Sequence, residues 1–256
     1  MEAGSTDRER PAIGPLLGAG KVAEAFAYGT DVLKLYRDPA ARSQAFAEAA
    51  VLAMVADHPV PSPAVFEAGQ YAGRWGLVMA RAAGQSLGTL AEADPGRIPD
   101  LLEAMVRLHL RVHACTEPRL PPLKRRLAHR MAKAPGLERE RDALLATLTE
   151  LPDGNRLCHG DFHAHNLIGT PETITIVDWP DASSGPPAAD ACRSYLLILP
   201  HVPDAAEAYL AAYARASGIT EASIRAWLPV LAAARLVENV PDEEPLLRRL
   251  ATGAPI

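Results

Sequence analysis

The N-terminal third of the chain alternates between short apolar segments and turn residues, a pattern typical of strands. Three apolar segments come first, and a Gly-Thr-Asp turn over residues 29–31 separates the second from the third. We predict strands at residues 16–17, 22–28 and 32–36, and two more within VPSPAVFEAGQ and RWGLVMA. The pattern therefore indicates a small sheet.

One helix interrupts this strand pattern, in the Ala-rich segment that follows the third strand. Asp38 is a good N-cap, and Pro39 suits the first helical position because the N–H that it lacks would have no helical partner there. We therefore predict a helix over residues 39–56, so that the sheet carries one helix.

From residue 97 onward the apolar period becomes helical. The segment IPDLLEAMVRLHLRVHAC places five apolar residues on one stripe: Leu101, Leu102, Met105, Leu108 and Val112. We predict further amphipathic helices over residues 122–133 and 137–150, and a strand in TITIVDW. The remainder is Ala- and Leu-rich and predicts helices broken by prolines.

The change from strand to helix pattern falls in MARAAGQSL, which we take as a boundary between two lobes. We predict an N-terminal lobe over residues 1–81 and a C-terminal helical lobe over residues 82–256. The first ten residues, MEAGSTDRER, are polar and charged, and we expect residues 1–10 to be flexible.

Composition narrows the class of protein. The 256 residues are 48% hydrophobic and 22% charged, as in an average globular protein. No apolar run reaches the ~20 residues of a spanning helix, the leader lacks a secretory core, and three scattered cysteines do not indicate disulfides. We expect a cytoplasmic protein that binds neither membrane nor nucleic acid, since its net charge is −5.

The segment LCHGDFHAHNLI, residues 157–168, has the highest concentration of candidate catalytic and metal-binding residues. In an extended strand His159, Asp161, His163 and His165 would share one face, which would favour a metal-dependent hydrolase. In an irregular loop Asp161 can act as a base for an attacking hydroxyl, with Asn166 as a metal ligand. We favour the loop, because that interpretation also gives roles to residues elsewhere in the chain.

The segment NLIGTPETITIVD has strand-like ends around a turn, which predicts an antiparallel hairpin. Centred on Glu172, the hairpin would place Asn166 opposite Asp178 and Ile168 opposite Ile176. Opposed Cβ atoms lie about 4.5–5.5 Å apart, so an amide oxygen and a carboxylate would converge. Both are oxygen ligands suited to Mg²⁺.

Two features of the N-terminal lobe suggest nucleotide binding. Gly18 and Gly20 lie between two strands, which disfavours a P-loop and favours a glycine flap over a nucleotide. Lys34 lies in the apolar strand VLKLY, although the chain has only four lysines against twenty-two arginines. A lysine retained there can bond phosphates, with Glu48 of the following helix as its partner.

These segments, in this order, resemble the aminoglycoside phosphotransferase and choline kinase family of the protein-kinase-like fold. HGDFHAHN resembles the H-G-D-x-x-x-x-N catalytic loop of that family, which is a specific motif. IVDW resembles the metal-binding segment of that family, and VLKLY resembles its lysine strand. RLH at residues 107–109 resembles the end of its L-x-x-L-H helix. The resemblance covers roughly residues 14–200 and implies a two-lobed α+β fold, with a small antiparallel sheet and one helix preceding a larger helical lobe.

The resemblance also implies roles for individual residues. Asp161 becomes the catalytic base, His159 a scaffold of its loop, and Asp190 a buried brace for that loop. The resemblance assigns no role to His163 or His165. The implied cofactor-site residues are Asn166 and Asp178 for Mg²⁺, Lys34 and Glu48 for the phosphates, Gly18 and Gly20 in the flap, and Met79, Ala80 and Ala82 beside adenine.

The resemblance implies an ATP- and Mg²⁺-dependent kinase of small molecules, such as an antibiotic phosphotransferase. Choline, homoserine and sugar kinases of the same fold, a nucleotide-binding pseudoenzyme and the metal-dependent hydrolase are the alternatives. Ala23 in place of a third glycine, DWPD without the glycine of D-F-G, and the lack of a long activation-loop insert argue against a protein substrate.

The phosphate acceptor is not identified by any of these motifs. A hydroxyl-bearing cationic molecule fits the acidic charge of the chain, and several acidic residues of the C-terminal lobe could receive a polyamine. These residues are Asp181, Glu207, Glu238 and the run over residues 242–244.

Overall fold

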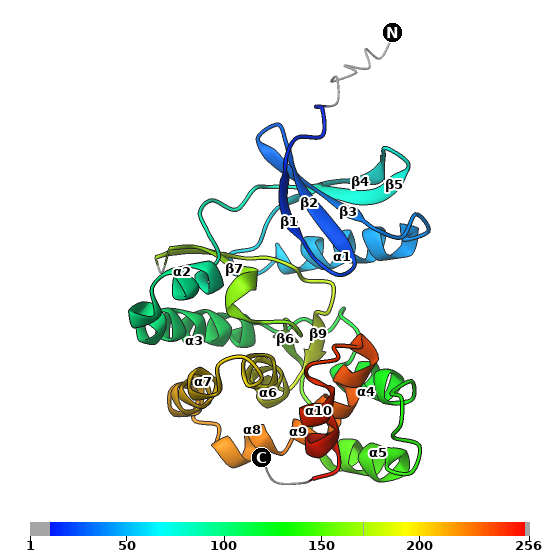
Figure 1. Cartoon of the computed structure of the whole chain (residues 1–256), viewed down its shortest axis with the longest axis vertical. Helices are drawn as coiled ribbons and strands as arrows, with labels where there is room; N and C mark the ends of the chain where they lie inside the picture. Colours follow the sequence, from blue (N-terminus) through cyan, green and yellow to red (C-terminus); the bar gives the residue numbers. More distant parts are fainter. Residues whose placement is uncertain (1–10, 171, 254–256) are drawn as a thin grey trace. The chain divides into compact units, whose positions relative to one another are not determined.

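The computed structural model describes residues 11–170 and 172–253, so the flexibility expected for residues 1–10 lies outside the described residues. The chain forms two compact units (Figure 1). The first contains residues up to 56 together with 63–82, and the second contains 57–62 together with the residues from 83 onward. One unit is a sheet with a helix and the other is mainly helical, which confirms the predicted α+β class.

The first unit is built on a five-stranded antiparallel sheet in the order β1-β2-β3-β5-β4 (Figure 1). All five strands predicted from the apolar pattern are present: β1 (Leu16–Ala19), β2 (Ala23–Tyr28), β3 (Asp31–Tyr36), β4 (Val65–Tyr71) and β5 (Arg74–Met79). Gly29 lies in the turn between β2 and β3 with a φ of +60°, a conformation that glycine adopts without strain.

The helix α1 (Arg42–Val55) packs on β4 and β5, and its Ala45 is buried in one cluster with Leu77 and Met79. The predicted start at residue 39 was wrong. Asp38 accepts a hydrogen bond from the Ala40 N–H at 2.8 Å, so its side chain stabilises a turn that precedes the helix and does not cap the helix itself.

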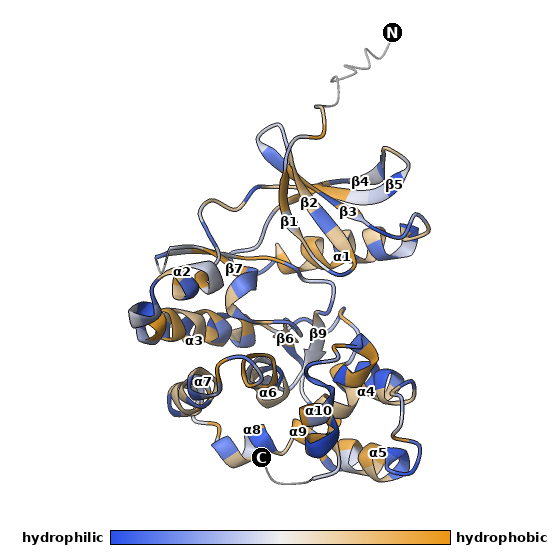
Figure 2. Cartoon of the chain, viewed as in Figure 1, coloured by the Kyte–Doolittle hydropathy of each residue, from blue (hydrophilic) through white to orange (hydrophobic). Residues whose placement is uncertain are grey.

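The second unit is assembled from nine helices within residues 83–170 and 172–253. Hydrophobic and hydrophilic residues alternate along the ribbon of α3 in Figure 2. Four residues of its predicted stripe are buried, whereas Leu102 is half-buried. The helices are α2 (Leu87–Ala93), α3 (Ile98–Ala114), α4 (Leu123–Met131), α5 (Arg141–Glu150), α6 (Pro187–Ile198), α7 (Pro203–Ser217), α8 (Glu221–Arg225), α9 (Leu228–Arg235) and α10 (Glu244–Ala251).

Helix α6 lies at the centre of this unit, in contact with α7, α8 and α9. All residues from Ala189 to Leu197 are buried, polar ones included, so α6 can hold Asp190 and Arg193 away from bulk water. Helix α3 continues to Ala114, five residues beyond His109, so the interpretation of RLH as a helix end was wrong. No helix within the described residues combines the length and apolarity needed to span a membrane.

Two short antiparallel two-stranded sheets complete the second unit, of which the second is a hairpin. β6 (Arg156–Cys158) pairs with β9 (Ser183–Gly185), and β7 (Leu167–Thr170) pairs with β8 (Thr173–Ile176). The predicted register of the hairpin was wrong by one residue, because Ile176 lies opposite Leu167 rather than Ile168.

The register follows from the pairing of Thr170 with Thr173 beside the turn, and the backbone also leaves the strand conformation at both open ends. A 3₁₀ turn, η2 (Ala164–Asn166), precedes β7, so Asn166 lies outside the strand and its carbonyl accepts a bond from the Val177 N–H at 2.9 Å. Asp178 has a φ of +65° and has left the strand as well. The two residues are therefore not a cross-strand pair, and their positions depend on irregular backbone that a strand pattern does not reveal.

Candidate active site

The segment between β6 and β7 is an irregular loop, so the alternative of a metal-bearing strand was wrong. The loop spans residues 159–166, ends in η2, and does not present its four alternate side chains on one face. His159 is fully buried, whereas the side chain of His165 is 56% exposed. We refer to residues 159–166 as the HGD loop.

Asp190 holds the start of the HGD loop through hydrogen bonds to its backbone. Its Oδ2 accepts a hydrogen bond from the His159 N–H at 2.7 Å, and its Oδ1 accepts one from the Gly160 N–H at 2.8 Å. Gly160 has a φ of +82°, and a Cβ there would lie 2.4 Å from the Asp181 carbonyl oxygen, so only glycine fits. The geometry bears out the interpretation of Asp190 as a brace.

Two histidines of α3 complete the surroundings of Asp190. The Nε2 atoms of His109 and His113 lie 3.0 and 3.1 Å from its Oδ2. Because an ionised carboxylate only accepts hydrogen bonds, both rings carry a proton on Nε2, and their Nδ1 atoms lie 2.7 and 2.6 Å from the hydroxyls of Tyr209 and Tyr213. The result is a closed, buried network that joins α3, α6, α7 and the HGD loop. We refer to it as the Asp190 network.

Burial determines the protonation states in this network. Burial and the neighbouring His113 lower the pKa of His109 to about 3, although Asp190 opposes them. Burial raises the pKa of Asp190, but hydrogen bonds from the two histidines hold it well below its usual range. His109, His113 and Asp190 lie close enough to hold a metal ion. Their polar atoms are already satisfied by one another, by tyrosine hydroxyls and by backbone N–H groups, so we assign them a structural role.

His159 links the HGD loop to the segment after β8. Its Nδ1 accepts a bond from the Asp161 N–H at 3.2 Å, which leaves Nε2–H to donate to the Val177 carbonyl at 3.1 Å. Burial lowers the pKa of His159, so the neutral ring is favoured. His159 thus lies where its expected role as a scaffold requires.

Asp161 presents its carboxylate at the surface of the loop, with 27% of the side chain exposed. The Asn166 Nδ2 donates both to its Oδ2 at 3.0 Å and to its backbone carbonyl at 2.9 Å. Burial raises the pKa of Asp161, but the hydrogen bond from His163 and the charges of His163 and Arg193 outweigh it and hold this pKa below its usual range. The group is therefore an ionised, oriented carboxylate.

His163 and Arg193 are site residues that the sequence did not reveal. The His163 Nε2 lies 3.4 Å from Asp161 Oδ2. An Arg193 Nη lies 3.9 Å from Asp161 Oδ1, and its Nε donates to the Gly160 carbonyl at 3.2 Å. No spacing rule singles out His163. Arg193, one helical turn after Asp190 on α6, could have been found from the i, i+3 relation.

His165 contacts helix α2 and not Asp161. Its Nε2 lies 3.5 Å from Glu92 Oε1 on α2, and a Cβ at Gly88 would lie only 2.4 Å from its Nδ1. His165 therefore packs the loop against α2, and we assign it no chemical role.

Asn166 offers one atom suited to a hard cation. Its Nδ2 is used by Asp161, and no described residue donates to its Oδ1. An amide oxygen together with the Asp178 carboxylate matches the oxygen donors that Mg²⁺ prefers. The residues present fit the ion in their chemistry, although the cross-strand argument that first suggested the pair does not hold.

In the first unit the expected ion pair is present. The Lys34 Nζ lies 2.7 Å from Glu48 Oε1, and only 13% of the lysine side chain and 2% of the glutamate side chain are exposed. The hydroxyl of Tyr36 donates to the other oxygen of Glu48. Glu48 is thus held by two donors and keeps the Lys34 ammonium in one place above the sheet.

The remaining candidates of the first unit lie at the ends of strands. Gly18 is in β1, where an added Cβ would meet nothing within 4 Å, and the Gly20 N–H closes the β1–β2 turn on the Ala23 carbonyl at 2.8 Å. Met79 ends β5 and is buried. Ala80 donates its N–H to Ala64 at 2.8 Å, which leaves its carbonyl to accept, and Ala82 ends the unit.

Comparison with known proteins identifies the family. Residues 24–227 match the family model described as "Phosphotransferase enzyme family". No curated protein matches the sequence significantly. The matched range includes the HGD loop and all the candidate catalytic, metal and nucleotide residues except Gly18 and Gly20.

Solved structures share the fold at low identity. Aminoglycoside phosphotransferase APH(4)-Ia is 16% identical with a TM-score of 0.69, over 95% of this chain and 93% of that one. Choline kinase LicA from Streptococcus pneumoniae is 13% identical with a TM-score of 0.68, over 96% and 94%. Aminoglycoside-3'-phosphotransferase of type VIII is 22% identical with a TM-score of 0.60, over 90% and 92%. These likenesses confirm the predicted kinase-like fold.

Proposed function

The chain belongs to the phosphotransferase enzyme family, and on that premise we propose that it transfers the γ-phosphate of ATP to a hydroxyl group of a small molecule. The observation that carries the proposal is the geometry of Asp161, an ionised carboxylate oriented by Asn166 on a loop that Asp190 fixes. Structures of similar fold support the nucleotide, since one was solved with ADP and hygromycin B and another with ADP and streptomycin.

Asp161 would act on the acceptor hydroxyl. Its carboxylate orients the hydroxyl for in-line attack and takes its proton as the new P–O bond forms. A pKa below the usual range makes Asp161 a weak base, which suits a transition state in which proton transfer is late. Orientation is then the larger part of its contribution.

Asn166 Oδ1 and the Asp178 carboxylate would hold Mg²⁺, which when bound neutralises charge on the phosphates of the nucleotide. Lys34, kept in position by Glu48 and Tyr36, would bond the phosphates from the first unit. In this scheme His159 serves as a positioning residue, because it touches the backbone of Asp161 and not the reacting atoms.

The first unit, with residues 1–81 as its approximate limits, would be the nucleotide-binding lobe, and residues 82–256 would carry catalysis and acceptor binding. Gly18 and Gly20 would cover the nucleotide. The carbonyl of Ala80 and the N–H of Ala82 would bond adenine beside Met79, since the Ala80 N–H is already used by Ala64. A small hydroxyl compound is the expected acceptor, and no protein substrate is expected.

The test compares wild type with Asp161→Asn in an ADP-release assay with MgATP and a panel of hydroxylated antibiotics, choline, homoserine, sugars and hydroxy acids. We expect acceptor-dependent turnover that falls at least about 10³-fold in the variant, with MgATP affinity within about threefold of wild type. Asp242→Asn, at an exposed position, is the matched control.

Near-normal activity of Asp161→Asn would overturn the proposed role of this residue. MgATP binding without turnover on any acceptor would instead favour the nucleotide-binding pseudoenzyme. If the protein bound no nucleotide at all, the kinase function itself would be wrong.

A further inference from the structure

A pocket in the second unit adjoins the HGD loop. It is lined by Gly160 of that loop and by residues of α4, α6 and α9, with an apolar floor that includes Leu127 and Leu231. Arg193 lines the same pocket and also lies 3.9 Å from Asp161, so one side chain links the pocket to the proposed base. The pocket is therefore a candidate site for the phosphate acceptor.

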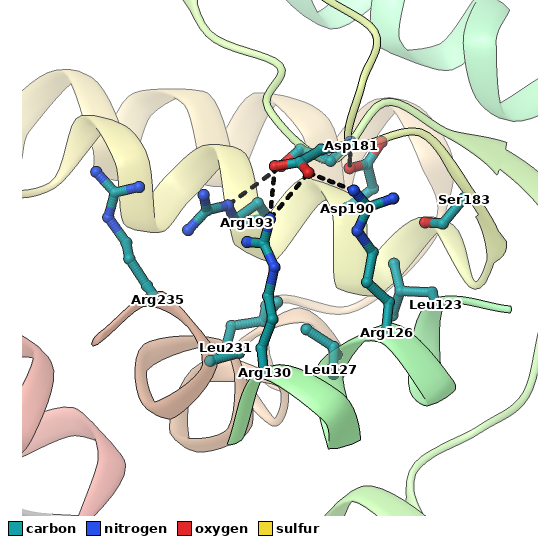
Figure 3. Close-up of a pocket in the computed structure, with 12 residues that line it drawn as sticks. Leu123, Arg126, Leu127, Arg130, Asp181, Ser183, Asp190, Arg193, Leu231 and Arg235 are labelled. Atoms are coloured by element: carbon teal, nitrogen blue, oxygen red, sulfur yellow. Dashed lines mark hydrogen bonds and ion pairs between the residues drawn. The ribbon is translucent and has the colours of Figure 1, made fainter. Parts of the chain in front are cut away.

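Arginines dominate the polar lining of this pocket. Figure 3 shows Arg126, Arg130 and Arg193 gathered around Asp181, and Arg235 is the fourth arginine of the lining. Arg130 bonds both oxygens of Asp181 at 2.8 and 2.9 Å, and Arg126 bonds the same carboxylate. We refer to these four residues as the arginine cluster.

The acidic residues suggested for a polyamine, apart from the exposed Asp242, are already paired with arginines. Asp181 is bonded by Arg126 and Arg130, and Glu238 lies between Arg130, Arg193 and Arg235 at 2.6–2.9 Å. The other paired acids are Glu207 with Arg225, Glu243 with Arg235 and Glu244 with Arg248. A cationic acceptor would have to displace these arginines, so the pairing argues against a polyamine.

The arginine cluster instead retains capacity for an anion. Its four guanidiniums contact four carboxylates, Asp161, Asp181, Glu238 and Glu243, so this capacity lies in unused N–H groups and not in surplus charge. No described residue accepts from Nη1 of Arg193 or from Nε of Arg126 and Arg130. Burial, and repulsion from Arg130 and Arg193, lower the pKa of Arg126 despite the neighbouring Asp181.

A hydroxyl in the pocket wall points to the same kind of ligand. Ser183 lines the pocket and is only 1% exposed, yet its Oγ has no hydrogen-bond partner among the described residues. A buried hydroxyl without a partner is costly, and an oxygen-rich ligand group would satisfy it.

Resting on the proposed function, we propose that the acceptor carries an oxyanion, a carboxylate or a phosphate, as well as the hydroxyl that is phosphorylated. The arginine cluster and Ser183 bind the oxyanion, since the unused N–H groups of Arg126, Arg130 and Arg193 and the Ser183 hydroxyl can each donate a hydrogen bond to its oxygens. The hydroxyl end of the molecule then lies at Asp161. Hydroxy acids, sugar acids and sugar phosphates fit this description, whereas polyamines do not.

The first experiment uses acceptors that share hydroxyls and differ in charge: gluconate, glucose 6-phosphate, glucose and glucosamine, with glycerate, glycerol and aminopropanediol as a smaller set. We expect kcat/KM for the best anionic member to exceed that of its neutral and cationic counterparts at least tenfold, which corresponds to about 1.4 kcal/mol. The carboxylate and phosphate members distinguish the two oxyanions. Preference for the amine or for aminoglycosides would overturn the proposal while leaving kinase activity established.

The second experiment measures sulfate binding by calorimetry and does not depend on turnover. Arg126→Gln should weaken sulfate binding about tenfold and Ser183→Ala about threefold, whereas Arg126→Lys should give an intermediate loss. Arg125→Gln, exposed on the same helix outside the pocket, should bind like wild type. Unfolding temperatures without sulfate identify any variant that is misfolded. If the arginine variants are misfolded, the sulfate affinity of Ser183→Ala is compared with that of wild type.

The two experiments separate the two claims. Sulfate binding that depends on Arg126 and Ser183, together with no turnover on any acceptor, would leave the oxyanion site standing and contradict the kinase function. Sulfate binding that is absent, or that neither substitution changes, would overturn the oxyanion site.

Discussion

Asp181 and Asp190 both lie within reach of the HGD loop, but their donors differ in kind. Asp190 is fully buried and accepts hydrogen bonds from two backbone N–H groups and two histidine rings. Asp181 is 24% exposed and is bonded by the guanidiniums of Arg126 and Arg130 at the wall of a pocket.

The difference shows what each kind of partner can do. Backbone N–H groups and histidine rings occupy both oxygens of Asp190 and leave no hydrogen-bonding capacity for a ligand, so the Asp190 network serves to hold the HGD loop in one conformation. Guanidinium donors hold Asp181 while leaving unused N–H groups beside it. The same side chain thus supports a scaffold in one place and a binding site in the other.

The largest effect should come from Asp190→Asn. The asparagine amide has a single oxygen for the four N–H donors that bond Asp190, and its own NH₂ group faces some of them. We expect a loss of about 3–5 kcal/mol in the free energy of unfolding. Urea denaturation of wild type and variant measures it. Asp242→Asn, at an exposed position, should change the same quantity by less than about 0.5 kcal/mol. A loss below about 1 kcal/mol at Asp190 would contradict the network described.

The pH dependence of stability tests whether His109 of the Asp190 network is buried without its second proton. The unfolded chain binds a proton at His109 below its ordinary pKa of 6.5, whereas the folded chain does so only near 3, so stability falls as pH drops between these values. At about pH 5 this one group should cost about 2 kcal/mol relative to about pH 7.5. Asp190 adds its own loss only below its ordinary pKa of 3.8.

His109→Gln isolates that contribution. The variant should be less stable than wild type at neutral pH, but its unfolding free energy should fall less between about pH 7.5 and about pH 5. His129→Gln, at an exposed position on α4, is the control and should keep the wild-type slope. An unchanged slope in His109→Gln would mean that His109 is not buried in the neutral form.

Asp181→Asn should have the smallest effect on stability, because Arg126 and Arg130 keep other acceptors. We expect a loss of about 1 kcal/mol in unfolding free energy. Sulfate binding should become tighter, on the order of three- to tenfold, since two guanidiniums lose their carboxylate. Calorimetry on wild type and variant decides the point, and weaker sulfate binding in Asp181→Asn would contradict the oxyanion site.

The sequence predicted elements well where a repeated pattern determines them. The strands of the first unit and helix α3 follow directly from apolar periods, and the pairing of Lys34 with Glu48 follows from a strand and a helix placed in order. The irregular backbone escaped prediction. Asp38 stabilises a turn before α1, and the register around Asn166 depends on a 3₁₀ turn and on the positive φ of Asp178.

Long-range ionic contacts escaped prediction for a different reason. Asp181 and Glu238 looked like available acids because the sequence does not show which arginines fold against them. Arg126 and Arg130 come from α4, Arg193 from α6 and Arg235 from α9, so only the tertiary structure brings them together. The contact of His163 with Asp161 likewise depends on the loop conformation.

In the proposed function, Asp161 directs transfer of the γ-phosphate to a hydroxyl of a bound small molecule. The most direct measurement mixes enzyme, MgATP labelled in the γ-phosphate and the preferred acceptor, and follows the label under single-turnover conditions. We predict that wild type places the label in a phosphate ester of the acceptor. Asp161→Asn should bind the nucleotide but form almost no labelled ester. Label that appears only as inorganic phosphate, or an equal yield of ester from the variant, would contradict it.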